Sequence, residues 1–192
     1  GQFPSNITSQ LNLTRLVAFD NEFTGTITPD FWRLAMLEVL ELGQNHFTGT
    51  IPEAIASLLS LESFLVNENH LSGLFPTSIF SMRRLVKLNV TGNNFTGTMP
   101  SEIGSLGSGF DARHRKYVNL ANNSFHGAVP PEVANIMNLN ELTLHGNDFV
   151  GTMPSAVCAL KTGQRKQSYS LTLLTSDCAD VDCSCSEACT CY

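Results

Sequence analysis

The chain has 192 residues, 42% of them hydrophobic, and a formal net charge of −6. This acidic balance argues against nucleic acid as a general partner, because nucleic-acid binding depends on clustered Lys and Arg. The sequence contains no run of about 18 apolar residues, so no segment is predicted to span a membrane. All six cysteines lie in the last fifth, which favours a disulfide-stapled cap made in an oxidising compartment.

The first residues already belong to a repeating pattern. Gly1 to Pro4 match Gly49 to Pro52, and each segment precedes a Leu at the same distance. We therefore expect the chain to start halfway through a repeat, with a half repeat over 1–12. Terminal repeats normally carry a polar cap, so this start indicates a fragment, a processed chain or a longer protein. The alternative is a coincidence of a few residues.

A short motif, Asn-x-Phe-x-Gly with small variations, recurs along the chain. It begins at Asn21, Asn45, Asn69, Asn93, Asn123 and Asn147, so that four steps are 24 residues and one is 30. A fixed period of this size predicts a solenoid. We expect six repeats that start near 13, 37, 61, 85, 115 and 139. The repeats with the initial half repeat occupy 1–160, and a Cys-rich C-terminal cap occupies 161–192.

Each repeat has an inner strand and an outer helical turn. The alternation at Leu40 and Leu42 predicts a short strand with both side chains inward. Asn45 follows where the chain turns, and its amide can satisfy backbone groups that the turn leaves unpaired. Phe47 should pack beneath it, so that successive copies form an apolar spine. The spacing of apolar residues over 53–58 fits one outer turn of helix.

This unit resembles the plant-specific leucine-rich repeat, with its pattern LxxLxLxxNxFxGxIPxxIxxLxx. The resemblance covers 1–160, and one departure is Leu71 where other repeats have Phe. It implies an α/β solenoid that is right-handed and curved. A parallel sheet would line the concave face, a second short sheet one flank, and short helices the convex face. The Cys-rich end resembles the C-terminal cap of leucine-rich-repeat proteins from diatoms and related algae.

The 30-residue step places six extra residues within Gly107–His114. Glycine and serine make this segment a loop between an outer turn and the next inner strand. It breaks the period and carries basic residues, so it is a candidate contact site. The residues predicted for that contact are Phe110, Arg113, His114 and Arg115. The alternative is an insertion tolerated at a solenoid edge.

Disulfides explain the cysteines better than a metal site does. Cys183 and Cys185, like Cys189 and Cys191, are separated by one residue, whereas structural zinc sites use two to four. No His lies near them, so we expect neither metal nor cofactor. Six cysteines allow 15 pairings. A first hypothesis pairs Cys158 with Cys178 and leaves the other four to pair within the tail.

Five Asn-x-Ser/Thr triplets make N-glycosylation the best-supported modification. They begin at Asn6, Asn12, Asn89, Asn94 and Asn122. The repeat pattern itself creates such triplets easily, so the number alone proves little. Asn94 should point out of a turn and is the strongest candidate. Asn89 should face the concave surface, where a glycan would obstruct binding.

The strand pattern also predicts which side chains face outward from the concave sheet. Lys116, Val39 and Ser63 belong to that predicted set. The candidate ligand-binding residues on this face are Phe19, Glu38, Glu41, Glu62, Leu65, Glu68, Lys87 and Tyr117. Acidic residues around exposed apolar ones suit a basic peptide or protein. The alternative is that these acids only keep the solenoid soluble.

Threonines recur along the predicted flank as Thr-Gly-Thr at 24–26, 48–50 and 96–98. A flat threonine ladder resembles the ice-facing arrays of some repeat proteins. The ladder breaks at Ser72–Leu74, however, and the repeat pattern often places Ser or Thr here. We therefore do not assign ice binding.

The sequence shows no Ser or Cys nucleophile paired with a histidine as general base, and no Gly-rich phosphate-binding loop. The five histidines occupy variable positions of different repeats. We expect no enzymatic activity. The resemblance implies an extracellular, secreted or cell-surface module that binds a protein, peptide or cell-wall polysaccharide non-covalently. The alternative is a structural or adhesive subunit that self-associates within a wall, surface or filament assembly.

Overall fold

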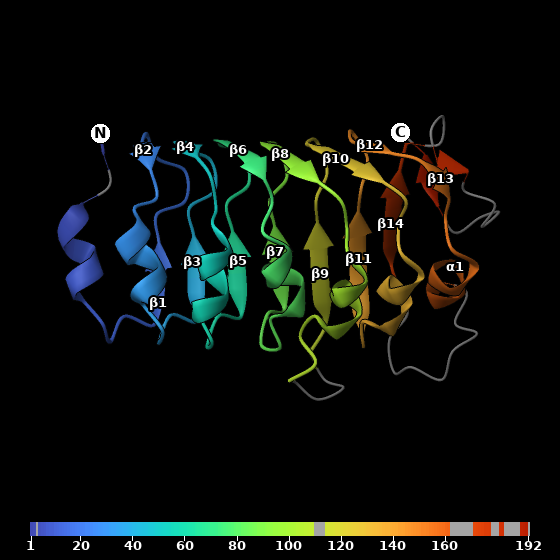
Figure 1. Cartoon of the computed structure of the whole chain (residues 1–192), viewed down its shortest axis with the longest axis horizontal. Coiled ribbons are helices and arrows are strands. Elements are labelled where there is room, and N and C mark those ends of the chain that lie inside the picture. Colours follow the sequence, from blue (N-terminus) through green and yellow to red (C-terminus); the bar gives the residue numbers. More distant parts are fainter. Residues whose placement is uncertain (3, 110–113, 162–170, 178–180, 183–188, 192) are drawn as a thin grey trace.

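Inner strands from successive turns of the chain form one long parallel sheet that runs along the whole molecule (Figure 1). The computed structural model describes residues 1–2, 4–109, 114–161, 171–177, 181–182 and 189–191. The fold expected from the repeat, a curved α/β solenoid of leucine-rich-repeat type, is confirmed.

The inner sheet takes one strand from each turn in chain order, so neighbouring strands are related by one repeat. Every pairing is parallel, because the chain completes a full turn before it returns to the sheet. Its eight strands are β1 (Arg15–Val17), β3 (Val39–Glu41), β5 (Ser63–Leu65), β7 (Lys87–Asn89), β9 (Lys116–Asn119), β11 (Leu139–Thr143), β14 (Leu173–Ser176) and β16 (Thr190–Cys191).

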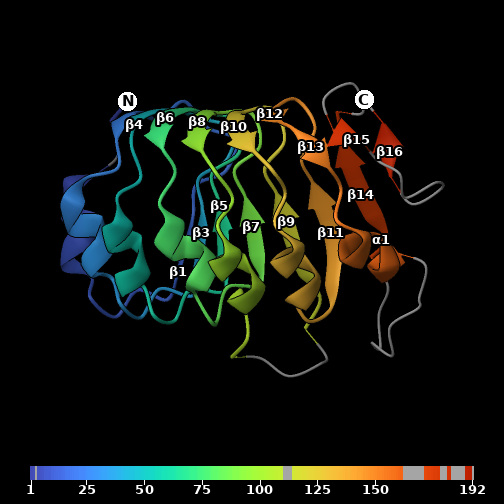
Figure 2. The ribbon, with the colours of Figure 1, turned by 45° about the vertical axis from the view of Figure 1, so that its right-hand side comes forward.

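A second parallel sheet follows the upper edge of the solenoid in Figures 1 and 2. Its six strands are β2 (Thr24–Thr26), β4 (His46–Gly49), β6 (His70–Leu74), β8 (Asn94–Gly97), β10 (Ser124–Gly127) and β12 (Asp148–Phe149). A third, two-stranded sheet pairs β13 (Gly151–Thr152) with β15 (Val181–Asp182). The predicted flanking sheet is therefore present.

The threonines of this flank have a packing role. The Cγ2 atom of Thr26 lies 2.8 Å from the point where a Cβ on Gly49 would stand. Thr50 covers Gly73 in the same way, at 2.9 Å. Only glycine leaves room for the methyl group of the preceding repeat, and the positive φ of 86° at Gly49 also favours glycine. Stacking of the repeats accounts for the Thr-Gly-Thr pattern.

The outer face carries one short helix per repeat, as Figure 2 shows in side view. Five-residue 3₁₀ helices follow each other as η1 (Ser5–Ser9), η2 (Pro29–Arg33), η3 (Glu53–Ser57), η4 (Thr77–Ser81), η5 (Ser101–Ser105) and η6 (Pro131–Asn135), and the α-helix α1 (Ser155–Lys161) comes last. A proline stands at or beside the start of each 3₁₀ helix, where its fixed φ suits helix entry. The expected convex helices are present.

Aromatic side chains form a spine between the sheets and the outer helices. Phe125 and Phe149 stack with ring centroids 6.3 Å apart. The third repeat has Leu71 in the spine, and Phe75 compensates for the lost volume. Its ring lies 5.0 Å from that of Phe95 and 5.5 Å from that of Phe125. The exchange of a small and a large residue keeps the core filled.

A ladder of asparagine side chains joins each repeat to the one before it. The Nδ2 group of Asn45 donates to the carbonyls of Leu42 and Gly43 in its own turn, both at 3.1 Å. It also donates to the carbonyl of Ala18 in the preceding repeat at 2.8 Å. Its Oδ1 accepts from the N–H of Phe23 at 3.0 Å. One side chain thus satisfies four backbone groups that a tight turn would leave unpaired.

The same four bonds recur at the later rungs Asn69, Asn93, Asn123 and Asn147. The rung at Asn123 follows the 30-residue step. It still donates to Val90 at 2.9 Å and accepts from Phe95 at 3.0 Å. The six extra residues therefore leave the ladder unchanged.

Adjacent asparagines allow a direct test of the ladder. Asn93 is buried and makes four bonds, whereas Asn94 is exposed on β8. We expect Asn93→Ala to lower the free energy of unfolding by about 2–4 kcal/mol, because it leaves several buried backbone groups unpaired. Asn94→Ala should change it by less than about 0.5 kcal/mol. Denaturant titration of both variants makes the comparison, and equal losses would refute a special role for the buried amide.

Candidate ligand-binding face

Outward side chains of the inner sheet stand in two parallel rows. Strand register aligns residues of one row across neighbouring repeats. The first row holds Arg15, Val39, Ser63, Lys87, Tyr117 and Glu141. The second row holds Val17, Glu41, Leu65, Asn89, Asn119 and Thr143. Because parallel strands lie about 4.8 Å apart, each row presents one side chain per repeat at that spacing.

Two hollows lie on this face, and Lys87 lines both of them; together they are called the groove. The first has a volume of about 230 Å³ and is lined by Arg15, Val39, Glu41, Glu62, Ser63, Val86, Lys87 and His114. The second has a volume of about 380 Å³ and is lined by Leu65, Lys87, Leu88, Asn89, Tyr117 and Asn119. A groove that joins aliphatic, aromatic and a few charged groups has the character of a recognition surface.

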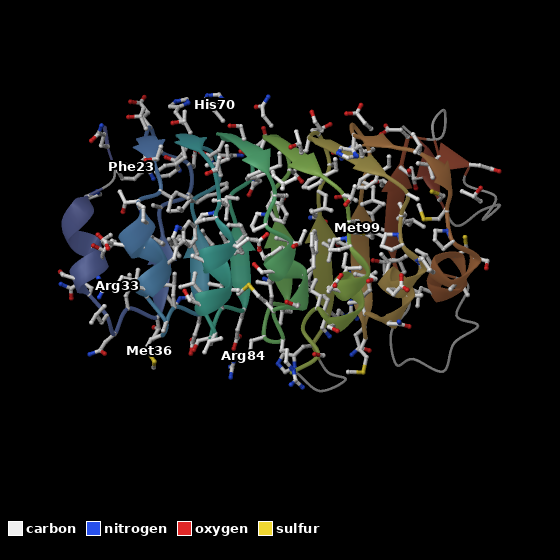
Figure 3. All side chains as sticks on the ribbon, in the orientation of Figure 1. Phe23, Arg33, Met36, His70, Arg84 and Met99 are labelled. Atoms are coloured by element: carbon white, nitrogen blue, oxygen red, sulfur yellow. The ribbon has the colours of Figure 1, made fainter. Side chains whose placement is uncertain are left out.

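Five of the eight predicted concave-face residues line these hollows, namely Glu41, Glu62, Leu65, Lys87 and Tyr117. Phe19 and Glu38 are exposed but line neither of them. Glu68 lies at a separate hollow on the upper edge, beside His46 and His70. Its backbone has a positive φ of 52°, since it stands at the turn that precedes the ladder asparagine. Figure 3 shows His70 at that edge.

The charge of the face is mixed. Arg84, from the lower edge in Figure 3, forms an ion pair of 2.7 Å with Glu62. Both side chains are partly exposed, so the pair contributes little to stability, but it offsets one of the predicted acids. Arg15 and Lys87 line the same hollow as Glu41. The groove therefore offers both signs of charge.

Two residues that line the hollows carry a buried polar atom without a hydrogen-bond partner among the described residues. Ser63 is 7% exposed, and its Oγ has no hydrogen-bond partner among the described residues. The Oδ1 of Asn119, in the second hollow, is likewise buried and unpaired within that part of the chain. Such atoms cost free energy unless a partner arrives. The sequence pattern predicted Arg15, Ser63 and Asn119 as outward residues of the concave face but did not count them among the ligand-binding candidates.

Lys116 was predicted to face outward, and this prediction is wrong. It is fully buried, and its Nζ donates to the carbonyl of Met137 at 2.7 Å. Arg115 occupies the position where other repeats have an inward Leu, and it is exposed. The pairing of β9 with β11 shifts by one residue between Leu139 and Glu141, which places Lys116 opposite Leu139. A lysine stem thus fills the core position. Val39 and Ser63 keep their outward places in the first row but are buried.

The segment predicted as a loop contact is described only at its two ends. Phe110 and Arg113 lie outside the described residues, whereas His114 and Arg115 are exposed. The N–H groups of Gly107 and Gly109 donate to the carbonyls of Met82 and Arg83, in the preceding repeat. His114 also lines the first hollow. The start of this segment is therefore anchored, and its end adjoins the concave groove.

The predicted glycosylation sites differ in accessibility. Asn12, Asn94 and Asn122 are exposed, and the side chain of Asn6 lies outside the described part. Asn89 is half-buried and lines the second hollow. Its Oδ1 accepts from the N–H of Thr91 at 3.1 Å. A glycan on Asn89 would fill the groove, as the sequence suggested.

Two cysteines of the cap are described with their side chains. Cys158, in α1, and Cys189 are half-buried, and both are disulfide-bonded. Cys178, Cys183 and Cys185 lie outside the described residues, as does the side chain of Cys191. The predicted pairing of Cys158 with Cys178 stays a prediction.

The described part of the chain holds no group of three His, Cys, Asp or Glu residues that could bind a metal ion. Within the same residues, no helix has the length and apolarity needed to cross a membrane.

Comparisons with known proteins agree with this geometry. A family model described as leucine rich repeat matches residues 35–95. A plant peptide hormone receptor, RGFR1, solved in complex with RGF2, aligns with 94% of this chain at 29% identity and a TM-score of 0.78. A TDR receptor aligns with 92% of it at 30% identity and a TM-score of 0.76. No curated protein matches the chain in sequence.

A plant ice-binding protein aligns with 92% of this chain at 21% identity and a TM-score of 0.75, a likeness of fold alone. The alignments cover 26% of the RGFR1 chain, 29% of the TDR receptor chain and 52% of the ice-binding chain. The sequence thus spans just over a quarter of each of these two receptor chains.

Burial of Lys116 lowers the pKa of its amine below 10.5. The folded state then binds this proton less tightly than the unfolded state, so stability should rise as pH increases towards 10.5. We expect wild type to gain stability relative to Lys116→Met between pH 7 and pH 10, by up to about 1.4 kcal/mol per unit of pKa depression. Urea titrations at several pH values give this difference. A constant difference would show that the amine titrates alike in both states.

Proposed function

Because this chain is a leucine-rich-repeat protein of the plant type, we propose that it acts as an extracellular recognition module. It binds a peptide or an extended protein segment, non-covalently, in the groove of its concave face. The proposal includes the division of the chain into repeats over 1–160 and a Cys-rich cap over 161–192.

The groove around Lys87 is the observation that carries this proposal. It joins two hollows, holds the half-buried aromatic ring of Tyr117, and exposes charged groups of both signs. Two buried polar atoms, on Ser63 and Asn119, lack hydrogen-bond partners within the described residues. Tyrosine and paired polar groups in a concave surface are typical of protein-binding hot spots.

The comparison with RGFR1 supports a peptide as the ligand class, since that receptor is a peptide hormone receptor and was solved with RGF2. The present chain spans only 26% of it. The proposal therefore concerns recognition by these repeats and does not extend to signalling by a whole receptor.

An extracellular location agrees with two further features. Asn12, Asn94 and Asn122 present exposed glycosylation triplets, and Cys158 and Cys189 take part in disulfides, which persist in oxidising compartments. We propose that the protein is a secreted or cell-surface glycoprotein whose cap is held by disulfides.

Glycosylation has a site-specific expectation. In protein secreted from a eukaryotic host, at least two of the five triplets should carry glycans, Asn94 among them, because its side chain is exposed. Asn89 should be bare in the ligand-binding form, since it lines the groove. Peptide mass mapping before and after enzymatic release of N-glycans measures each site. A fully occupied Asn89 in protein that still binds would argue against the groove.

A structural or adhesive role is the second candidate. Among the described residues, β1 has β3 as its one partner strand, so this edge of the inner sheet offers unpaired backbone groups to a further strand. A subunit of this kind would form concentration-dependent assemblies in sedimentation experiments, whereas a recognition module should stay monomeric.

Binding can be tested by selecting short random peptides on the immobilised full chain. We expect enriched peptides that compete with one another for a single site. Tyr117→Ala should weaken them by about fivefold or more, because a groove tyrosine is a typical hot spot. Leu74→Ala is the control, since Leu74 is 69% exposed on the flanking sheet, outside the groove. Binding should be measured by titration calorimetry, with thermal unfolding as the check on folding.

Two outcomes would contradict the proposed peptide binding in the groove. If no peptide is enriched while cell-wall polysaccharide binds, the ligand class is wrong. If Tyr117→Ala and Leu74→Ala weaken binding alike, the concave groove is not the site.

A further inference from the structure

Charges of both signs line the first hollow, where Arg15, Glu41 and Lys87 form no ion pair among the described residues. Glu41, on β3, and Lys87, on β7, both line it. Among the described residues, neither forms an ion pair, whereas Glu62 in the same hollow is paired with Arg84. Glu41 is half-buried and Lys87 is exposed, so a ligand can reach both. Each is therefore available to a ligand group of the opposite charge.

A small residue separates these two charges. Ser63, on β5, stands beside Lys87 in the first row, and Leu65 stands beside Glu41 in the second. Ser63 lines the hollow between the two charges, and its side chain is short and buried. A short side chain at this place leaves room for the main chain of a ligand between Glu41 and Lys87.

The repeat geometry sets the distance between the charges. Two strand steps, from β3 to β7, correspond to about 10 Å, and the shift from one row to the other adds about 7 Å along the strands. The diagonal is therefore about 12 Å, the length of about three or four residues of extended peptide. A straight peptide that lies along the solenoid could present one charged residue to each site.

Resting on the recognition function proposed above, we propose that this groove selects peptides with a basic and an acidic residue about three or four positions apart. The basic side chain lies at Glu41, the acidic side chain lies at Lys87, and the intervening main chain crosses Ser63. The charge pattern, more than the net charge, sets specificity, because a wrong sign at either site brings like charges together. This differs from the simple basic ligand that the acidic composition suggested.

The test uses short random peptides with amidated C-termini, selected on the full chain and on two charge variants. On wild type, peptides with this basic–acidic spacing should be enriched. The best of them should bind Lys87→Glu at least about tenfold more weakly. Replacement of its acidic residue by Lys should restore binding to Lys87→Glu, and the mirror exchange should restore binding to Glu41→Lys. Glu102→Lys, an exposed change on η5, is the control and should bind the parent peptide as wild type does.

The outcomes distinguish a failure of the charge-spacing inference from a failure of peptide recognition itself. Enriched peptides without the charge spacing, or without rescue by the swapped peptides, overturn the specificity inference and leave peptide recognition standing. If the parent peptide, synthesised with a free C-terminal carboxylate, keeps its affinity after its acidic residue is replaced by Ala, the chain end lies at Lys87 and the specificity inference is also overturned. The absence of any enriched peptide overturns peptide recognition itself.

Discussion

The hydrogen bonds of the ladder asparagines are the interaction on which the other features depend. A solenoid turns the chain sharply at the end of every inner strand, and each turn leaves N–H and C=O groups inside the protein. The amide of Asn45 satisfies groups in its own turn and groups in the preceding one. The same side chain therefore closes one turn and stacks it on its neighbour, so that the local and long-range structure share one cause.

This stacking explains how recognition can vary while the fold stays constant. The ladder and the phenylalanine spine occupy the interior, and they fix the register of the inner strands. Outward positions such as Ser63 and Lys87 then fall into rows, whatever residues they hold. Specificity depends on which side chains fill the rows, and a small residue in one row can create a hollow between larger neighbours. Ser63 lines the first hollow beside the larger Lys87 and Val39.

Much of the fold followed from the sequence because its period is a strong and redundant signal. The inner strands, the flanking sheet and the outer helices all follow from the spacing of Leu, Asn and Phe. Lys116 was misplaced because the expectation treated each repeat as identical, whereas Arg115 cannot fill the apolar position and a one-residue shift in pairing compensates.

The charge of the groove was misjudged for another reason. Arg84 reaches Glu62 from a loop, and strand periodicity carries no information about loop side chains. Pairing of the cysteines depends on three-dimensional proximity, which their spacing alone does not give.

The long step between Asn93 and Asn123 has a consequence for how such chains can change in length. Stacking is set on the ladder side of the solenoid, where the bonds of Asn123 match those of every other rung. Extra residues between outer turn and inner strand leave these bonds intact, because loop closure costs little free energy as length grows. An insertion after Gly107 would therefore lengthen this loop next to the groove and leave the stacking of the repeats intact. The edge that adjoins His114 is the natural place at which this scaffold could acquire a new contact and keep its old architecture.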